Sequence, residues 1–222
     1  MVSREGGALP NIALFGLYMV VFLFSLSLHE AAHAWTAEKF GDPTGRYLGR
    51  ITLNPLPHID VFGTLIFPAV GFFTGMAMFG WAKPVPWNPR HVKDRRKADI
   101  WISAAGPISN LLALIGFVIL LKVFHVYLFS GGQIRGTSVE PLYRMCEIGA
   151  QLNITLAVFN LIPIPPLDGS WILPHFLPYN LARGYEQLRP YGFFILIACL
   201  YLGIFGLVLA PFWSMLRVII YS

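Results

Sequence analysis

The sequence has little charge and almost no cysteine, and both shortages limit the kind of protein it can encode. Charged residues make up only 12% of the 222 residues, against 56% hydrophobic residues, and the mean hydropathy is +0.62. So little polar surface cannot keep a globule of this size in solution, and the composition therefore predicts a membrane protein. The two cysteines, Cys146 and Cys199, lie in apolar stretches, which excludes a disulfide framework and a cysteine zinc site.

Long polar linkers, internal repeats and low-complexity tracts are also missing, so residues 1–222 are expected to form a single membrane domain. The formal charge of +5 and the pI of 9.4 do not indicate nucleic-acid binding, because no basic run is interleaved with aromatic residues. The excess of lysine and arginine is better explained by membrane topology, since cytoplasmic loops collect these residues.

Four apolar stretches are long enough to cross about 30 Å of hydrocarbon as helices. They are roughly residues 9–33, 100–121, 146–164 and 191–213. A fifth stretch, residues 61–78, is broken by glycines and a proline, and the proline-rich residues that follow favour extended chain. The expected fold is an all-α polytopic membrane protein with about four to six transmembrane helices and a re-entrant or β-like segment between the first and second core helices.

The motif His29-Glu30-Ala31-Ala32-His33 stands at the end of the first apolar stretch. Positions 29 and 33 stack one turn apart on one face of a helix, so their imidazoles can bind one tetrahedral Zn²⁺. Glu30 is the next residue after His29 on the helix, where it can take a proton from a water molecule at the metal without being a ligand. The alternative is a chance sequence or a pair of hydrogen-bonded helical histidines, but a glutamate between two histidines in a membrane is costly unless it is used.

A third metal ligand is expected near a membrane boundary, and Asp168 is the best candidate. It follows a stretch with three prolines, at positions 163, 165 and 166, which end or unwind the helix that starts near Cys146. Such freed backbone is tolerated in a membrane only beside protein or a wet cavity. The other interpretation of Asp168 is a helix cap or a loop aspartate. Four other candidates, His58, Asp60, His91 and His175, fall in expected loops or surface segments, where a solvated side chain is the simpler explanation. His125 lies at the end of a span.

If His29, His33 and Asp168 share one ion, the ends of the first and third long spans face the same side of the membrane. Residues 61–78 must then cross an even number of times, so we infer that they enter and return without spanning. Charge gives an independent test, because eleven of the sixteen lysines and arginines fall on the metal side: Lys39, Arg46, Arg50, Lys83, Arg90, Lys93, Arg95, Arg96, Lys97, Arg183 and Arg189. The positive-inside rule places that side in the cytoplasm and both termini outside.

These motifs resemble those of the site-2 protease family of intramembrane metalloproteases, peptidase family M50. That family carries His-Glu-x-x-His on one transmembrane helix and Asn-x-x-Pro-x-Pro-x-Leu-Asp-Gly on another, which match residues 29–33 and 160–169. A third family feature, Ala-Gly-Pro, matches residues 105–107 and is followed here by Asn110. Residues 53–60 and 80–89 resemble the short prokaryotic branch that lacks PDZ and CBS domains, although Val61 stands where that branch usually has proline.

The resemblance implies a metalloprotease domain with a catalytic core of about residues 11–170 and a C-terminal transmembrane helix of about residues 190–213. It implies that His29, His33 and Asp168 bind Zn²⁺ and that Glu30 is the catalytic acid and base. Asn160 is expected to contact the substrate, with interhelical hydrogen bonding as the alternative. Gly106 and Pro107 are expected to serve close packing and the start of a helix.

The implied substrates are transmembrane or membrane-anchored proteins, cleaved within or near the lipid bilayer in regulated intramembrane proteolysis. The implied location is a prokaryotic cell membrane, with the active site toward the cytoplasm. Two other function classes compete. A non-catalytic protein that escorts transmembrane helices with a vestigial zinc site has no use for the base Glu30. A metal transporter needs polar residues along several helices, and the spans outside the two motifs are nearly bare of ionisable groups.

Overall fold

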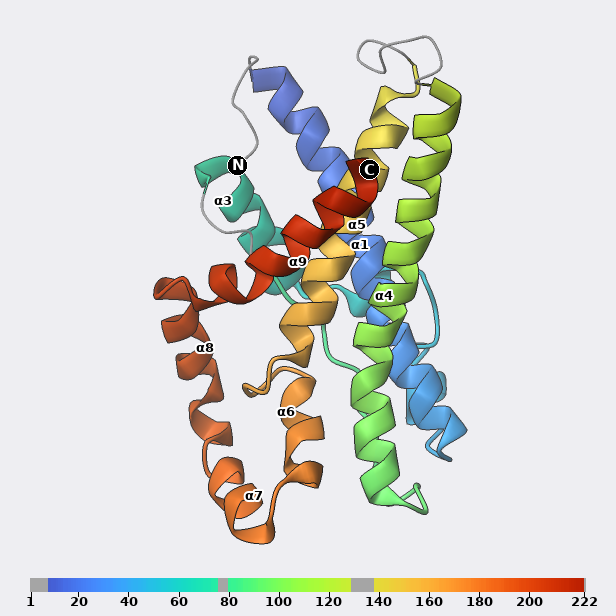
Figure 1. Cartoon of the computed structure of the whole chain (residues 1–222). Helices are drawn as coiled ribbons and strands as arrows, with labels where there is room; N and C mark the ends of the chain where they lie inside the picture. The colour runs from blue at the N-terminus through green and yellow to red at the C-terminus, as the bar shows by residue number, and fades with distance from the viewer. Residues whose placement is uncertain (1–7, 76–79, 129–137, 222) are drawn as a thin grey trace.

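The structure is a computed structural model of the chain that describes residues 8–75, 80–128 and 138–221. The regular elements in these ranges are all helical: α1 Ala8–Lys39, α2 Thr44–Tyr47, η1 Leu56–His58, η2 Val61–Ile66, α3 Phe67–Thr74, α4 Arg95–Leu128, α5 Glu140–Leu161, α6 Gly169–Ile172, η3 Leu173–Phe176, α7 Tyr179–Glu186, η4 Arg189–Tyr191, α8 Gly192–Tyr201 and α9 Ile204–Tyr221. Figure 1 shows α1, α4 and α5 as three long helices packed against one another. The predicted all-α class is confirmed for the described residues.

The directions of the three long helices bring the functional ends together. Ile102 of α4 contacts His33 of α1, and further along α4 Asn110 contacts Ser25, nearer the start of α1, so the two helices are antiparallel. Figure 1 shows α5 running antiparallel to α4 as well. The end of α1, the beginning of α4 and the end of α5 therefore lie at the same end of the bundle.

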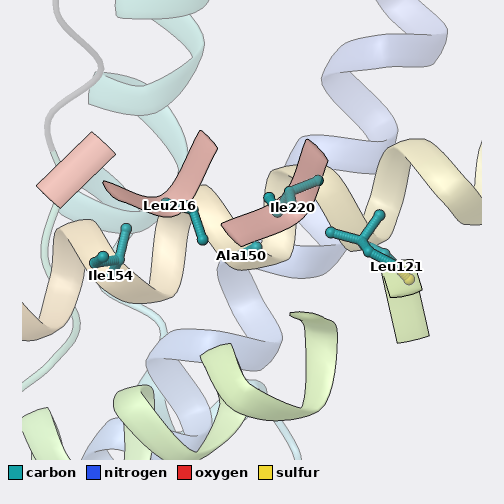
Figure 2. Packing of buried hydrophobic residues seen from close by; sticks show 6 residues of the cluster. Leu121, Ala150, Ile154, Leu216 and Ile220 are labelled. Carbon is teal, nitrogen blue, oxygen red and sulfur yellow. The ribbon is translucent and has the colours of Figure 1, made fainter. Parts of the chain in front are cut away.

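Apolar side chains fill the contacts between the helices and also cover their outer faces. One buried cluster joins α4, α5 and α9 through Leu121, Cys146, Ala150, Ile154, Leu216 and Ile220 (Figure 2). On the outside of α4, Leu112, Ile115 and Ile119 are exposed. Helices of this length with apolar residues on both the packed and the exposed faces are typical of contact with lipid.

Among the described residues, three helices are long and apolar enough to cross a membrane: Ile12–Lys39, Arg95–Val126 and Ile204–Tyr221. The first two correspond to the predicted spans 9–33 and 100–121. The predicted span 146–164 corresponds to α5, which is not one of these three helices. It nevertheless lies inside the bundle, where it packs against α1, α4 and α9.

The fourth predicted span, residues 191–213, is wrong as a single helix. α8 ends at Tyr201, and α9 begins at Ile204. Between them Gly203 takes a left-handed φ of 71°, which glycine adopts without a Cβ clash. The apolar run around this glycine concealed the break, because hydropathy does not report backbone dihedral angles.

The predicted re-entrant segment, residues 61–78, is helical over η2 and α3, and its residues 76–78 lie outside the described part of the chain. The chain after the segment returns to its beginning, because the Trp81 N–H donates to the Gly63 carbonyl at 3.2 Å. α3 lies beside the first half of α1 (Figure 1), where Phe15 packs on an aromatic ring of α3 with centroids 5.1 Å apart. The chain therefore leaves the bundle and returns to it at the same point, as a re-entrant segment would. The β-like geometry that was the other expectation is not found among the described residues.

A buried carboxylate ties the proline-rich residues 80–89 to the end of α1. Asp42 accepts hydrogen bonds from the N–H and hydroxyl of Thr44, from the Asn88 N–H at 2.7 Å and from His91 Nδ1 at 2.7 Å. Burial alone raises the pKa of Asp42, but these hydrogen bonds to the charged form outweigh burial and hold its pKa below the usual value. These side-chain contacts, together with the hydrogen bond from the Lys83 N–H to the His58 carbonyl at 2.9 Å, position the proline-rich segment, which forms no sheet among the described residues.

We expect Asp42→Asn to lower the free energy of unfolding at pH 7, and this loss to shrink in acid. Because the folded-state pKa is depressed, the charged carboxylate stabilises the fold above the unfolded pKa of about 3.9. That contribution is lost as the pH falls through the folded pKa, so the difference between wild type and variant should begin to shrink below about pH 4 and close below the folded pKa. Unfolding in detergent measures this, with Glu186→Gln as control, because Glu186 is exposed and pairs with Arg189. A difference that is constant from neutral to acid pH would contradict the assignment.

Candidate metal centre

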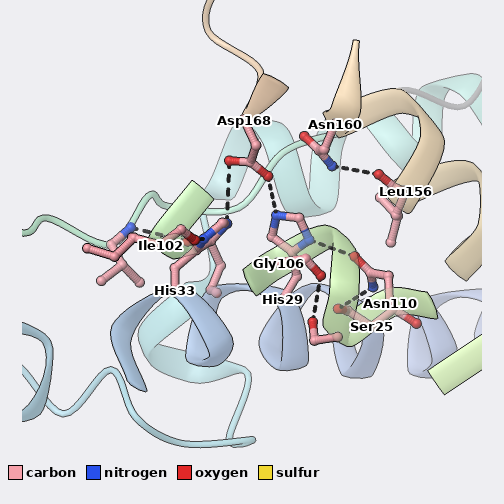
Figure 3. A network of polar contacts seen from close by, with 12 residues as sticks. Ser25, His29, His33, Ile102, Gly106, Asn110, Leu156, Asn160 and Asp168 are labelled. Atoms are coloured by element: carbon pink, nitrogen blue, oxygen red, sulfur yellow. Dashed lines mark hydrogen bonds and ion pairs between the residues drawn. The ribbon is translucent and has the colours of Figure 1, made fainter. Parts of the chain in front are cut away.

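Three side chains from distant parts of the chain converge where α1 meets the loop after α5. His29 and His33 come from α1, and Asp168 comes from the loop after α5. His29 Nε2 lies 3.1 Å from Asp168 Oδ2, and His33 Nε2 lies 3.4 Å from Asp168 Oδ1 (Figure 3). All three candidate ligand atoms lie within 4.8 Å of one another. The structure thus brings together the three residues that the motifs single out.

Hydrogen bonds on the far side of each imidazole fix its tautomer. His29 Nδ1 lies 2.6 Å from Asn110 Oδ1, and His33 Nδ1 lies 2.6 Å from the Ile102 carbonyl. Both partners can only accept, so both Nδ1 atoms carry the hydrogen and donate it. When the rings are neutral, their Nε2 atoms present lone pairs to the carboxylate of Asp168, which is also an acceptor.

Acceptors that face one another in this way need a cation between them, either a proton on a ring nitrogen or a metal ion. Asp168 Oδ2 is buried and, apart from its contact with His29 Nε2, has no hydrogen-bond partner among the described residues. In a tetrahedral site with bonds of about 2.0–2.1 Å, neighbouring ligand atoms lie about 3.3 Å apart. The separations from the two Nε2 atoms to the carboxylate, 3.1 Å to Oδ2 and 3.4 Å to Oδ1, are close to that spacing. Two imidazoles and a carboxylate also leave the fourth position open, as in catalytic zinc sites, so the donor set fits Zn²⁺.

Asp168 lies in the loop after α5, and the residues on both sides of it are fixed by packing or by a helix. α5 ends at Leu161, before the three prolines, as predicted. Leu167 is buried in a cluster with Leu196, Phe205 and Leu209 of α8 and α9. On the other side, α6 begins directly after Asp168, whose side chain makes no capping hydrogen bond to it. The helix-cap interpretation of Asp168 is therefore not supported, and its carboxylate is directed at α1 instead (Figure 3).

Asn110 orients His29, a role that the sequence did not assign to it. Asn110 is fully buried, and its Nδ2 donates to Asn153 Oδ1 at 2.8 Å and to the Ser25 carbonyl at 3.3 Å. Asn153 in turn donates to Ser25 Oγ at 2.9 Å. A chain of polar contacts thus runs from His29 across all three long helices. The available signal was the polar residues inside apolar spans, which are costly there unless they are hydrogen bonded.

Gly106 lets α4 lie directly against both imidazoles. A Cβ atom built at this position would lie 2.5 Å from His29 Nε2 and 2.5 Å from His33 Nε2. The prediction of a close-packing role for Gly106 agrees with this geometry. The helix-start role predicted for Pro107 is wrong, because α4 begins at Arg95 and Pro107 lies in its interior.

Glu30 and Asn160 make contacts of different kinds. Glu30 follows His29 and so lies about 100° round α1 from it, and its Oε2 accepts the Val85 N–H of the proline-rich segment at 3.1 Å. Asn160 donates its Nδ2 to the Leu156 carbonyl at 2.9 Å, within its own helix (Figure 3). The interhelical hydrogen bond offered as an alternative for Asn160 is not present among the described contacts, and a substrate role for it stays a prediction.

The other sequence candidates for ligands lie outside this cluster and have partners of their own. Asp60 accepts the Gly63 N–H, His91 pairs with Asp42, His175 pairs with Asp99, and His125 lies 3.1 Å from the Tyr143 hydroxyl. The prediction of a solvated side chain is wrong for His58, which is only 2% exposed. Its ring lies beside Arg50 and the Thr52 carbonyl.

We expect Gly106→Ala to abolish metal binding, because the added methyl group would occupy the space between the two imidazoles. Elemental analysis of the purified protein should find zinc at background. Gly116→Ala is the matched control, since it lies further along α4 and no atom comes within 4 Å of its Cβ position. Full zinc content in Gly106→Ala would show that the ion is held elsewhere.

Comparison with known proteins gives the family. Residues 17–202 match the sequence profile of peptidase family M50. A Bacillus subtilis protein that carries the name zinc metalloprotease YwhC is 42% identical over 182 residues, which cover 81% of this chain and 78% of that protein. A Mycolicibacterium smegmatis protein that carries the name zinc metalloprotease Rip2 is 31% identical over 215 residues, which cover 90% of this chain and 76% of that protein. No solved structure matches the chain significantly. The chain therefore belongs to peptidase family M50, the site-2 protease family that its motifs predicted.

Proposed function

We propose that this chain is an intramembrane zinc metalloprotease that hydrolyses peptide bonds within or near the transmembrane segments of membrane proteins. One observation carries the proposal: His29 and His33 lie on a helix apolar enough to cross a membrane, and they meet Asp168 at ligand spacing. Membership of a peptidase family supports the reaction class, and the zinc metalloprotease names of the relatives support the metal.

The substrate class follows from where the site lies. The candidate ligands belong to α1, whose span runs from Ile12 to Lys39, so a peptide reaches them within the bilayer or at its boundary. We therefore propose transmembrane or membrane-anchored proteins as substrates. A helix in lipid hides its carbonyls in internal hydrogen bonds. Substrates should carry residues that weaken the helix near the cut, where Gly or Pro costs about 1–3 kcal/mol relative to Ala.

The residues of the site divide the chemistry between them. Zn²⁺ held by His29, His33 and Asp168 would polarise the scissile carbonyl and lower the pKa of a water molecule to about 7. Glu30 takes a proton from the attacking water and delivers it to the leaving nitrogen as the C–N bond breaks. The Val85 N–H holds Glu30 Oε2, which leaves Oε1 for this proton.

Replacing Glu30 by Gln should lower the rate of cleavage by about 100-fold or more, because a general base contributes about 10²–10⁴-fold. The assay uses a synthetic transmembrane peptide with Gly-Pro at its centre, incubated with purified protein and analysed by mass spectrometry. Zinc content should not change. Glu38→Gln is the matched control, because Glu38 lies on the same helix but pairs with Arg46 outside the site. Cleavage by Glu30→Gln at the wild-type rate would contradict the role of Glu30, whereas no cleavage by the wild type would favour a non-catalytic helix-binding protein.

We further propose that the metal centre faces the cytoplasm in a prokaryotic cell membrane. Lys39 ends α1, the helix that carries His29 and His33, and Arg46 follows soon after it. The basic run 93–97 lies at the beginning of α4, at the same end of the bundle. Arg4 and Arg135, predicted for the opposite side, lie outside the described residues. By the positive-inside rule the basic end is cytoplasmic.

Cysteine labelling in intact cells tests this orientation. Lys93→Cys, on the exposed chain before α4, should resist an impermeant maleimide added outside and react after lysis. Ser138→Cys, exposed before α5 at the other end of the bundle, should react from outside. Both changes are made in a Cys199→Ser background, which removes the partly exposed native cysteine. The other native cysteine, Cys146, is buried and can stay. The reverse labelling pattern would overturn the proposed orientation.

A further inference from the structure

Arg50 is a buried cation near the candidate active site to which the mechanism above gives no role. Its side chain belongs to a residue that is only 5% exposed, and among the described residues it forms no ion pair with a carboxylate. Nη1 donates to the Lys83 carbonyl at 3.0 Å, and Nη2 donates to the Pro84 carbonyl at 3.3 Å. Burying a guanidinium without a counter-ion is costly, so its partners matter.

His58 contacts the guanidinium of Arg50 from another side, and its imidazole is neutral. Its Nε2 lies 3.0 Å from the Thr52 carbonyl, which only accepts, so Nε2 carries the hydrogen and Nδ1 faces Arg50 Nη1 at 3.5 Å. Burial lowers the pKa of His58, and the charge of Arg50 lowers it further. The positive charge of Arg50 is therefore directed at the two backbone carbonyls rather than shared with a second cation.

The Pro84 carbonyl and the Val85 N–H belong to the same peptide group. In a trans peptide these two bonds point in opposite directions. The carbonyl accepts from Arg50, and the N–H donates to Glu30 Oε2 at 3.1 Å. The peptide thus lies between a cation and a carboxylate, aligned with its own dipole, and each hydrogen bond polarises and strengthens the other.

The proline-rich sequence offers few backbone hydrogen bonds to orient this peptide. The Lys83 N–H donates to the His58 carbonyl at 2.9 Å, while side chains bind the Lys83 and Pro84 carbonyls and the Val85 N–H. Pro84 and Pro86 have no N–H, and the segment forms neither helix nor strand. Lys83 and Pro84 are exposed, so apolar burial does not hold them. Asp42 fixes the segment further along, at the Asn88 N–H, while the part that contacts Glu30 is fixed by Arg50.

We propose that Arg50 is a positioning residue for catalysis, which holds the Lys83 and Pro84 carbonyls so that the Val85 N–H fixes Glu30 beside the metal ligands. The inference rests on the proposed protease function. Arginine suits this role because its planar fork presents separate N–H groups to two carbonyls, whereas the lysine ammonium is a compact point charge.

Amide hydrogen exchange tests the contact without reference to activity. Val85 carries the only amide hydrogen between Pro84 and Pro86, and its exchange should speed up about 3- to 10-fold in Arg50→Ala and in Arg50→Lys. The Asn88 amide, which Asp42 accepts, should keep its rate. Arg46→Ala is the matched control, because Arg46 is exposed and pairs with Glu38. Unchanged Val85 exchange in folded Arg50→Lys would overturn the proposal.

Kinetics on the Gly-Pro transmembrane peptide test the consequence. Arg50→Ala should lower kcat by about 10- to 100-fold with KM and zinc content unchanged. Added guanidinium ion should restore part of kcat in Arg50→Ala, but not in Arg50→Lys, where the lysine side chain fills the space. Loss of zinc together with activity, and no recovery with guanidinium, would indicate a merely structural role and overturn the proposal. If the wild type does not cleave the peptide, the protease function fails, and Val85 exchange still decides the role of Arg50.

Discussion

Two imidazoles and a carboxylate face one another inside a bundle of apolar helices, and this contact ties α1 to the loop after α5. Leaving a buried charge without its partner costs about 3–5 kcal/mol, so the site is stable only with a cation between its three acceptors. α1 supplies two of the groups, α4 fixes their far nitrogens through Asn110 and Ile102, and the loop after α5 supplies Asp168. Lipid gives no hydrophobic drive for helix association, so these polar contacts also help to hold the three helices together.

The base is held by a different kind of structure from the ligands. His29 and His33 lie within a helix and are braced by a second helix, whereas the partner of Glu30 is a segment without regular secondary structure. Asp42 and Arg50, both from the short stretch after α1, fix that segment at its two ends. The ligand geometry thus depends on rigid helix packing, while the position of the base depends on a few side-chain contacts that single substitutions can remove.

Much of the site could be predicted from sequence because its signals are local. The spacing of His29 and His33 places both on one helix face, and the prolines before Asp168 mark the end of α5. Features that depend on contacts between helices could not be predicted. The role of Asn110 needs the position of α1, the burial of His58 needs the packing of its loop, and the break at Gly203 depends on one backbone dihedral angle.

X-ray absorption at the zinc K edge of the purified protein tests the central claim, that His29, His33 and Asp168 hold one ion. Two imidazole nitrogens at about 2.0–2.1 Å and carboxylate oxygen at about 2.0–2.2 Å should surround the zinc in the wild type. The imidazole scattering should fall by half in His33→Ala protein reloaded with zinc. Sulfur ligands, or the same imidazole signal with and without His33, would contradict the account.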